Sequence, residues 1–334
     1  MENATTGRVV VITGASAGLG RAMARAFASR GDKVALLARG EDGLAEADRE
    51  ASAVGAEAMA IACDVSDAAA VESAAQAVQE RFGAIDVWIN NAMVSVFSPG
   101  AQITPDELRR VMEVNFLGTV NGTQAALRRM RKQSRGTVIQ IGSALAYRSI
   151  PLQSAYCASK AAIRAYSDSI RSELYHERSR VRLCMAQLPA INTPQFEWVR
   201  TRLPGMPRPL PPIYAPEVIA DAIVALSLHP RREVWIGGSS VKAILGQKVV
   251  GPLLDRYLAR RGYRDQQDAV PVEPYRRDNL FYPVEGDRGA HGPYLGMERQ
   301  HSAQVWLDFH RRAVAVAAAA VGLALGAVWA RART

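Results

Sequence analysis

A tyrosine, a lysine and a serine carry the clearest chemical signal in this sequence. Tyr156 and Lys160 lie in a stretch with helical periodicity, and residues four apart project from one face of a helix. A phenol titrates near about 10, but a neighbouring ammonium favours the phenolate, so the pair can act as acid and base near neutral pH. Ser143 follows the apolar run 138–141, where its hydroxyl can hold a substrate oxygen. The three residues predict proton transfer at an oxygen atom.

A glycine-rich turn near the N-terminus supports a catalytic role for Tyr156 and Lys160. A Tyr-x-x-x-Lys spacing alone would not, because it is common on protein surfaces. Residues 13–20 read TGASAGLG, follow the apolar run 9–12 and precede a helical pattern. Glycines let a backbone approach its ligand closely, and the N–H groups and dipole of a helix N-terminus attract phosphate. The spacing G-x-x-x-G-x-G differs from the commoner G-x-G-x-x-G fingerprint. Its place between strand and helix predicts dinucleotide binding.

The elements that must position these groups alternate between β-branched runs and helical patterns up to about residue 240. Such alternation predicts an α/β fold, a doubly wound parallel sheet of the Rossmann type with helices on both faces. The expected strands are 8–13, 33–38, 58–62, 87–90, 137–142, 181–186 and 233–236. The expected helices include 44–54, 68–81, 105–133, 155–177 and 216–228.

Composition shifts divide the chain into three parts. Residues 1–260 form the expected catalytic domain, residues 261–304 a Pro/Gly/Arg-rich arm or linker, and residues 305–334 a C-terminal extension ending in an apolar, alanine-rich helix. Within the first part, residues 189–216 carry eight prolines and predict a lid over the site. Residues 241–257 show helical apolar spacing, which predicts a packing helix, with an interfacial membrane helix as the alternative.

Charge and cysteine usage narrow the class of protein. The net charge is +9, but the arginines are scattered and form no basic stripe with interleaved aromatic residues, which argues against nucleic acid as a partner. The three cysteines have no paired spacing, and the histidines form no i, i+4 pair. This pattern argues against disulfides and a metal site and is typical of a reducing compartment. With an N-terminus that enters a strand directly, we expect a cytoplasmic catalytic domain.

With these motifs the chain resembles the short-chain dehydrogenase/reductase superfamily, in its compact branch, over about residues 6–240. Further matches to that family's pattern are Asp64-Val65 after the third strand, the segment Asn90-Asn91-Ala92, and an asparagine within Glu-Val-Asn-Phe. The resemblance implies a catalytic tetrad of Asn115, Ser143, Tyr156 and Lys160. It also implies coenzyme contacts from Gly14, Ser16, Gly18, Leu19, Gly20, Asp64, Val65, Asn91, Ala92, Tyr156, Lys160 and Thr193.

The resemblance implies a mechanism as well. Hydride would pass between a nicotinamide and a carbonyl carbon while Tyr156 exchanges a proton with the oxygen. Ser143 would position the carbonyl, and Lys160 would hold the nicotinamide ribose and lower the pKa of the tyrosine. Asn115 would support a water-mediated proton relay. Two positions depart from the family pattern, Met93 in place of a glycine and Ala190 after Pro189 in place of a glycine, and neither removes a polar catalytic group.

The end of the second strand favours NADP(H) over NAD(H) as the coenzyme. NAD enzymes place an acidic residue there to accept from the ribose hydroxyls, whereas this chain has Ala38-Arg39 and no carboxylate before Glu41. A guanidinium can bind a 2′-phosphate in a fork, and a carboxylate would repel it. We therefore expect Arg39 to contact the coenzyme.

The resulting prediction is an NADP(H)-dependent oxidoreductase acting on a small-molecule carbonyl/alcohol pair, with a lipophilic substrate suggested by the apolar lid. One alternative is a catalytically idle NADP-binding sensor or membrane scaffold, whose expected signature would be loss of a tetrad residue. Another is a sugar-nucleotide epimerase or dehydratase, in which the glycine turn usually reads G-x-x-G-x-x-G. Family members commonly dimerise through the helices that carry Asn115 and Tyr156, so the resemblance also implies a homodimer or homotetramer.

The C-terminal part contains an uncharged apolar segment, residues 313–330. As a helix, this segment would extend roughly 27 Å, just enough to cross a bilayer. Arg311 and Arg312 precede it and Arg331 follows it. The sequence favours a C-terminal membrane anchor that leaves the catalytic domain in the cytoplasm, and the alternative is an alanine-rich helix that packs on protein.

Truncation tests the anchor. We expect a chain ending before Trp306 to leave the membrane fraction, because the whole apolar segment is then missing, while the full chain sediments with membranes. Cell fractionation with immunodetection measures the difference, and equal partitioning of the two chains would contradict an anchor.

Overall fold

A seven-stranded parallel sheet forms the centre of the protein in the computed structural model, which describes residues 7–311 and 314. The spatial order is β3-β2-β1-β4-β6-β7-β12, and every neighbouring pair is parallel. The chain runs outward from β1 to β3 and then returns to the other side of β1, so the strand order reverses between β1 and β4. Ligands in such sheets bind beyond the carboxyl ends of the strands at this switch point. The strands are β1 (Val9–Thr13), β2 (Lys33–Ala38), β3 (Ala58–Ala62), β4 (Val87–Asn90), β6 (Thr137–Ser143), β7 (Arg182–Leu188) and β12 (Glu233–Trp235).

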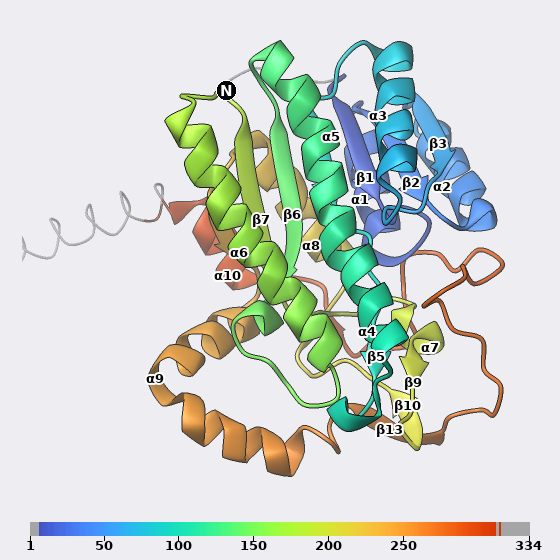
Figure 1. The fold of residues 1–334 in the computed structure, drawn as a ribbon, viewed down its shortest axis with the longest axis vertical. Coiled ribbons are helices and arrows are strands. Elements are labelled where there is room, and N and C mark those ends of the chain that lie inside the picture. The colour runs from blue at the N-terminus through green and yellow to red at the C-terminus, as the bar shows by residue number, and fades with distance from the viewer. Residues whose placement is uncertain (1–6, 312–313, 315–334) are drawn as a thin grey trace, which may run out of the picture.

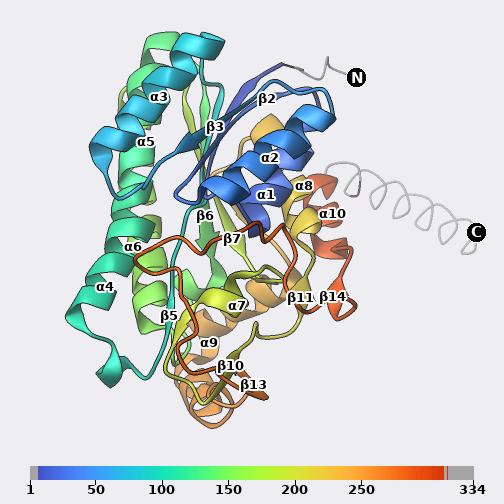
Figure 2. The ribbon, with the colours of Figure 1, turned by 90° about the vertical axis from the view of Figure 1, so that its right-hand side faces the viewer.

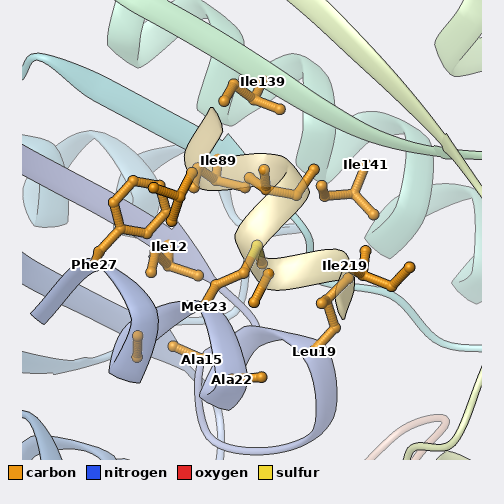
Figure 3. Close-up of a cluster of buried hydrophobic side chains, with 14 of the residues drawn as sticks. Ile12, Ala15, Leu19, Ala22, Met23, Phe27, Ile89, Ile139, Ile141 and Ile219 are labelled. Atoms are coloured by element: carbon orange, nitrogen blue, oxygen red, sulfur yellow. The ribbon is translucent and has the colours of Figure 1, made fainter. Parts of the chain in front are cut away.

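Helices cover both faces of the sheet, as Figures 1 and 2 show. One layer consists of α1 (Gly18–Ala28), α2 (Glu41–Ala53) and α8 (Pro216–Leu228), and the other of α3 (Ala68–Phe82), α5 (Gly118–Gln133) and α6 (Ser154–His176). Successive residues of β1 are buried on opposite faces: Val10 and Ile12 join the cluster under α1 and α8, and Val9 and Val11 join the cluster under α3 and α5. Figure 3 shows Ile12, Met23 and Phe27 in the first cluster. Apolar side chains on both faces are what a central parallel strand requires, and the doubly wound Rossmann-type fold is confirmed.

The expected helix over 105–133 is confirmed in its bounds, but it is not a regular α-helix throughout. It consists of α4 (Pro105–Met112), a π-turn (Glu113–Leu117) and α5 (Gly118–Gln133). A wider turn has no signature in apolar periodicity, because the flanking helices keep their buried faces. The ends of the other strands and helices expected between residues 8 and 236 lie within three residues of the observed ones.

The proline-rich segment 189–216 folds into short pieces at the carboxyl edge of the sheet. They are β8 (Ala190–Ile191), α7 (Gln195–Trp198), β9 (Arg200–Thr201), β10 (Gly205–Pro207) and β11 (Ile213–Tyr214). The strand β9 pairs with β5 (Val96–Phe97), which follows β4, and single turns of 3-10 helix lie at Gly100–Gln102 and Ala144–Ala146. This segment therefore sits over the edge where the sheet's ligand is expected.

The chain after β12 returns to the same edge. The helix α9 (Gly238–Arg261) is longer than the expected 241–257 and is kinked at Val250, ahead of Pro252. The strand β13 (Gln267–Pro271) pairs with β10, and β14 (Glu298–Arg299) pairs with β11. Between them, residues 272–297 run across the carboxyl edge of the sheet, as the red-orange trace in Figure 2 shows. The last helix is α10 (Ala303–Phe309).

The apolar segment 313–330 lies outside the described residues, apart from residue 314. In the part of the chain that the structure describes, no helix combines the length and apolar character that crossing a bilayer requires.

Candidate active site

The glycine turn between β1 and α1 is built so tightly that side chains are excluded. Gly14 and Gly18 adopt φ angles of +67° and +58°, which L side chains rarely tolerate. A Cβ at Gly20 would lie 2.0 Å from the carbonyl oxygen of Gly14, and one at Gly14 would lie 2.8 Å from Cα of Ala92. Gly14 and Gly20 thus hold the start of α1 close to β1 and to the segment after β4, and Gly18 lies against Thr193. Gly20 does not line the cavity described below.

Asn91 and Thr13 fix the turn from the side of β4. The Asn91 side-chain amide donates to the carbonyl oxygens of Thr13 at 2.9 Å and Gly14 at 3.3 Å. The Thr13 hydroxyl oxygen in turn accepts from the backbone N–H groups of Asn91 and Ala92 at 2.9 and 3.0 Å. These bonds tie the two strands together at the point where the strand order reverses.

A single cavity of about 800 Å³ extends from the end of β2, past the glycine turn, to the carboxyl end of β6. Such a volume lies in the range of small-molecule and cofactor sites. Two expected site residues, Gly20 and Asn115, lie outside its wall. All the others line it: Gly14, Ser16, Gly18, Leu19, Arg39, Asp64, Val65, Asn91, Ala92, Ser143, Tyr156, Lys160 and Thr193. The glycine-turn backbone and the tetrad side chains at the two ends fit a dinucleotide.

The end of the cavity next to β2 is strongly polar. Arg110 pairs with the Asp64 carboxylate at 2.5 Å. Burial alone would raise the pKa of Asp64, but hydrogen bonds from Arg110 and Ser66 hold it below its ordinary value. The pKa of Arg39 is lowered, first by burial and then by the positive charge of Arg110. Arg110 is paired with Asp64 and does not line the cavity, whereas Arg39 lines it and can meet an anionic ligand.

The Arg39 guanidinium is engaged by a distant part of the chain. It donates to the backbone carbonyl oxygens of Asn279 at 2.6 Å and Phe281 at 3.0 Å. The sequence predicts that Arg39 contacts the coenzyme but gives no sign of these backbone partners, because residues 272–297 show no periodicity.

Tyr156 and Ser143 meet at the carboxyl end of β6. Ser143 is the last residue of β6, and its hydroxyl oxygen accepts from the N–H of Leu145 in the 3-10 turn that follows. Burial raises the pKa of Tyr156 to about 12, and a hydrogen bond with Ser143 acts in the opposite direction. Tyr156 is therefore protonated at neutral pH, the form that a proton donor needs.

Lys160 lies one helical turn beyond Tyr156 and is only 3% exposed. Its ammonium donates to the carbonyl oxygen of Ile141 at 2.7 Å and lies 5.6 Å from the centre of the Tyr156 ring. Burial lowers the pKa of Lys160 to about 8. The expectation that Lys160 lowers the pKa of Tyr156 is therefore wrong for this structure. The cost of burying a phenolate dominates, and the ammonium is directed at a strand carbonyl.

Asn115 is a positioning residue. It is fully buried in the π-turn, where its amide nitrogen donates to the carbonyl of Val94 and the hydroxyl of Ser159, both at 3.0 Å. Its side-chain oxygen accepts from the N–H of Val94 at 2.8 Å. Asn115 thus joins the loop after β4 to helix α6. Its backbone carbonyl oxygen accepts from the hydroxyl of Thr119 at 2.7 Å.

The cavity wall also contains apolar residues that sequence analysis did not name as site residues, beside polar ones that include Arg148, Arg208 and Lys242. Phe97 and Phe196 pack edge to face, with ring centres 6.2 Å apart. Leu254 and Leu258 of α9 line the same wall.

Arg148 holds α9 in place by pairing with Asp255 and bonding Gln247, both at 2.6 Å. The apolar spacing of 241–257 was the available signal, but it does not show which face meets the site. The wall also contains Val94, Leu145, Ile150, Leu188, Trp198, Leu210 and Tyr257.

Comparison with known proteins gives the class. The family model for short chain dehydrogenases matches residues 8–203. The chain is 33% identical over 331 residues to the uncharacterized oxidoreductase YxnA of Bacillus subtilis, which covers 98% of this chain and 90% of the relative. The chain therefore belongs to the short-chain dehydrogenase/reductase family and is an oxidoreductase.

Solved structures agree on the fold and differ in coenzyme. An alcohol dehydrogenase from the archaeon Thermococcus sibiricus, complexed with 5-hydroxy-NADP, has a TM-score of 0.60 and 31% identity and covers 69% of this chain and 95% of its own. An NAD⁺-bound xylitol dehydrogenase has a TM-score of 0.55 and 28% identity and covers 57% of this chain and 72% of its own.

The buried lysine predicts the pH dependence of carbonyl reduction. With a pKa of about 8, Lys160 is cationic below pH 8 and neutral above it, whereas Tyr156, with a pKa of about 12, stays protonated across this range. We expect kcat/KM for reduction to be level below pH 7 and to fall above pH 8. The Lys160→Arg variant should shift this fall to higher pH, because arginine keeps its charge. If the Lys160→Arg variant has normal thermal stability and its kcat/KM falls at the same pH as in the wild type, the fall does not report the titration of Lys160.

Proposed function

We propose that this protein is an NADP(H)-dependent oxidoreductase that interconverts a carbonyl and an alcohol. The observation that carries this proposal is the convergence of Ser143, Tyr156 and Lys160 at one end of a cavity. The glycine turn and Arg39 line the same cavity. A catalytic acid and a phosphate-binding turn are thus separated along one continuous space, as hydride transfer from a dinucleotide requires.

Each side chain has a role in this reaction. When bound, NADPH supplies the hydride that adds to the carbonyl carbon. The hydroxyls of Ser143 and Tyr156 hold the carbonyl oxygen, and Tyr156 gives it the proton that completes the alcohol. Lys160, fixed by Ile141, binds the nicotinamide ribose and helps to reprotonate the tyrosine. General acid catalysis of this kind contributes roughly 10²–10⁴-fold.

Arg39 supports NADP(H) over NAD(H). It lines the cavity at the end of β2, where a guanidinium can bind a 2′-phosphate. NAD enzymes place a carboxylate directly after β2 to accept from the ribose hydroxyls. In this sequence no carboxylate follows β2 before Glu41.

The apolar residues of the cavity wall support a lipophilic substrate. Aromatic rings from β5 and α7 and leucines from α9 line the same cavity as Tyr156, so burial of an apolar substrate would supply binding energy. The alternative of an idle NADP sensor is disfavoured because every tetrad side chain is present. The epimerase alternative is disfavoured by the spacing of the glycine turn.

Removal of the tyrosine hydroxyl tests the reaction. We expect Tyr156→Phe to reduce NADPH-dependent turnover at least 100-fold, by the general acid's contribution, with little change in NADPH affinity. Oxidation of NADPH should be followed against ketones and aldehydes graded from small and polar to long-chain and apolar. The matched control is Tyr166→Phe, a half-buried tyrosine on the same helix that does not line the cavity. Equal turnover in wild type and Tyr156→Phe would overturn the proposal.

Exchange of Arg39 tests the coenzyme assignment. We expect Arg39→Asp to move the preference toward NAD(H), because an aspartate repels the 2′-phosphate and accepts from ribose hydroxyls. Arg39→Gln is the control and should weaken NADPH binding without improving NADH binding. The ratio of the two dissociation constants, from fluorescence titration, is the readout. An unchanged ratio in both variants would exclude Arg39 as the selective residue.

A further inference from the structure

Residues 272–297 are the central part of the arm or linker expected over 261–304, and from here on the word arm means 272–297 alone. They cross the carboxyl edge of the sheet between β13 and β14 (Figure 2). The family model ends at residue 203, so the arm is an addition to the matched region. It passes over the end of β2 and then over the start of α1, the two places where a dinucleotide's adenosine and phosphates are expected.

The arm is fastened at the end of β2. Arg39 donates to the carbonyl oxygens of Asn279 and Phe281, and Nε of Arg110 donates to that of Leu280 at 3.2 Å. The Leu280 side chain is fully buried and belongs to the core cluster that contains Val65. Both a buried apolar side chain and several charge-assisted hydrogen bonds therefore hold this part of the arm.

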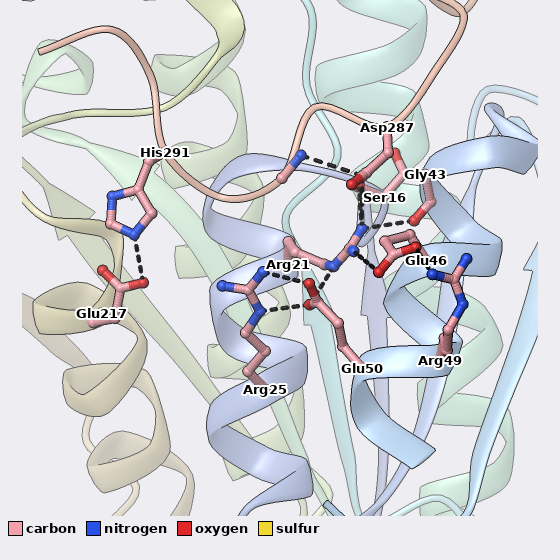
Figure 4. A network of polar contacts seen from close by, with 11 residues as sticks. Ser16, Arg21, Arg25, Gly43, Glu46, Arg49, Glu50, Glu217, Asp287 and His291 are labelled. Carbon is pink, nitrogen blue, oxygen red and sulfur yellow. Dashed lines mark hydrogen bonds and ion pairs between the residues drawn. The ribbon is translucent and has the colours of Figure 1, made fainter. Parts of the chain in front are cut away.

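A second attachment lies at the glycine turn. The N–H of Gly18, the first residue of α1, donates to the carbonyl oxygen of Gly289 at 2.9 Å. Asp287 pairs with Arg21 at 3.2 Å, and the fully buried Arg21 also pairs with Glu50 at 2.6 Å, as Figure 4 shows. The arm thus reaches the helix N-terminus at which a pyrophosphate would bind.

A third attachment lies a few residues further along the arm, at Asn192. The N–H groups of Gly292 and Tyr294 donate to the backbone and side-chain oxygens of Asn192, at 3.3 and 3.1 Å. A Cβ at Gly292 would lie 2.4 Å from the carbonyl oxygen of Thr193, so only glycine permits this approach. The arm is therefore held on both sides of the glycine turn.

The arm forms part of the wall of the cavity rather than filling it. Its residues Asn279, Pro283, Val284, Gly286 and Arg288 line the same space as the glycine turn. Arg288 stands between the two arm residues that are bonded to α1. It makes no hydrogen bond or ion pair with any residue that the structure describes, whereas its neighbour Asp287 is paired. The Arg288 side chain is exposed, and it lines this cavity next to Gly289, whose carbonyl oxygen is bonded to Gly18 of the glycine turn. An exposed guanidinium without an anionic partner at this place can bind a phosphate group.

We propose that the arm is a structural part of the coenzyme site, in which Arg288 binds the pyrophosphate and the arm must open for the coenzyme to enter or leave. This inference rests on the proposed dinucleotide-dependent function. The first turn of α1 supplies N–H groups and a positive dipole on one side of the pyrophosphate, and Arg288 supplies a positive charge on the other. Opening breaks the Asp287–Arg21 pair, so coenzyme release is slowed by the arm.

Coenzyme binding to matched arm variants tests the role of Arg288. We expect Arg288→Gln to raise the Kd of both NADPH and NADH about tenfold, as for a lost hydrogen bond to a charged group. The control is Arg277→Gln, an exposed arm arginine that pairs with Glu285 and does not line the cavity. Fluorescence titration gives the Kd, and thermal unfolding without coenzyme shows that the variants are folded. Identical Kd values for Arg288→Gln and Arg277→Gln would overturn the assignment, as would a loss confined to NADPH, which would place Arg288 at the 2′-phosphate.

Release kinetics test the opening step. We expect Asp287→Asn to increase the rate of NADPH dissociation, measured by stopped-flow displacement. Bound NADPH should slow trypsin cleavage after Arg288 in the wild type. A dissociation rate equal to that of the wild type, together with cleavage that NADPH leaves unchanged, would show that the arm does not gate the site. If the wild-type protein binds neither NADPH nor NADH, the proposed function itself fails, whereas tight wild-type binding that no arm variant alters overturns only the role of the arm.

Discussion

The contact between the glycine turn and the end of β4 is the constraint on which the rest of the site depends. Gly14 lies against Ala92, and Gly20 lies against Gly14, so closely that no side chain fits at any of these approaches. Asn91 and Thr13 hold the two strands in this position. With β1 and β4 fixed together where the strand order reverses, the start of α1 faces the carboxyl end of β6 across one cavity.

The catalytic end of that cavity is governed by burial more than by attraction between its charges. Tyr156 keeps its proton because a buried phenolate is costly, and Lys160 loses its proton more readily because a buried ammonium is costly. The Ile141 carbonyl and the Ser143 hydroxyl orient the two groups. The site is therefore set for proton donation to an oxygen at neutral pH, and a ribose bound at Lys160 would add a further hydrogen-bonding partner.

The arm connects the coenzyme end of the site with the C-terminal part of the chain. Its attachments at Arg39, Gly18 and Asn192 involve residues far apart in sequence, and each uses backbone atoms of the arm. A segment held mainly through its backbone needs few particular side chains, which explains a composition rich in proline, glycine and charged residues. Some side chains also contribute: Leu280 and Tyr294 are buried in core clusters, and Asp287 pairs with Arg21.

The order of strands and helices, the glycine turn and the Ser143, Tyr156 and Lys160 constellation could all be read from the sequence, because periodicity and short motifs are local properties of the chain. Three features could not be read in this way: the π-turn at Asn115, the cavity wall formed by α9, and the partners of Arg39. The direction of the Tyr156 pKa was also predicted wrongly. Each of these depends on burial or on contacts between residues up to about 240 positions apart, as between Arg39 and Asn279. Only the folded chain brings such residues together, since the arm carries no periodic pattern that would show where it lies.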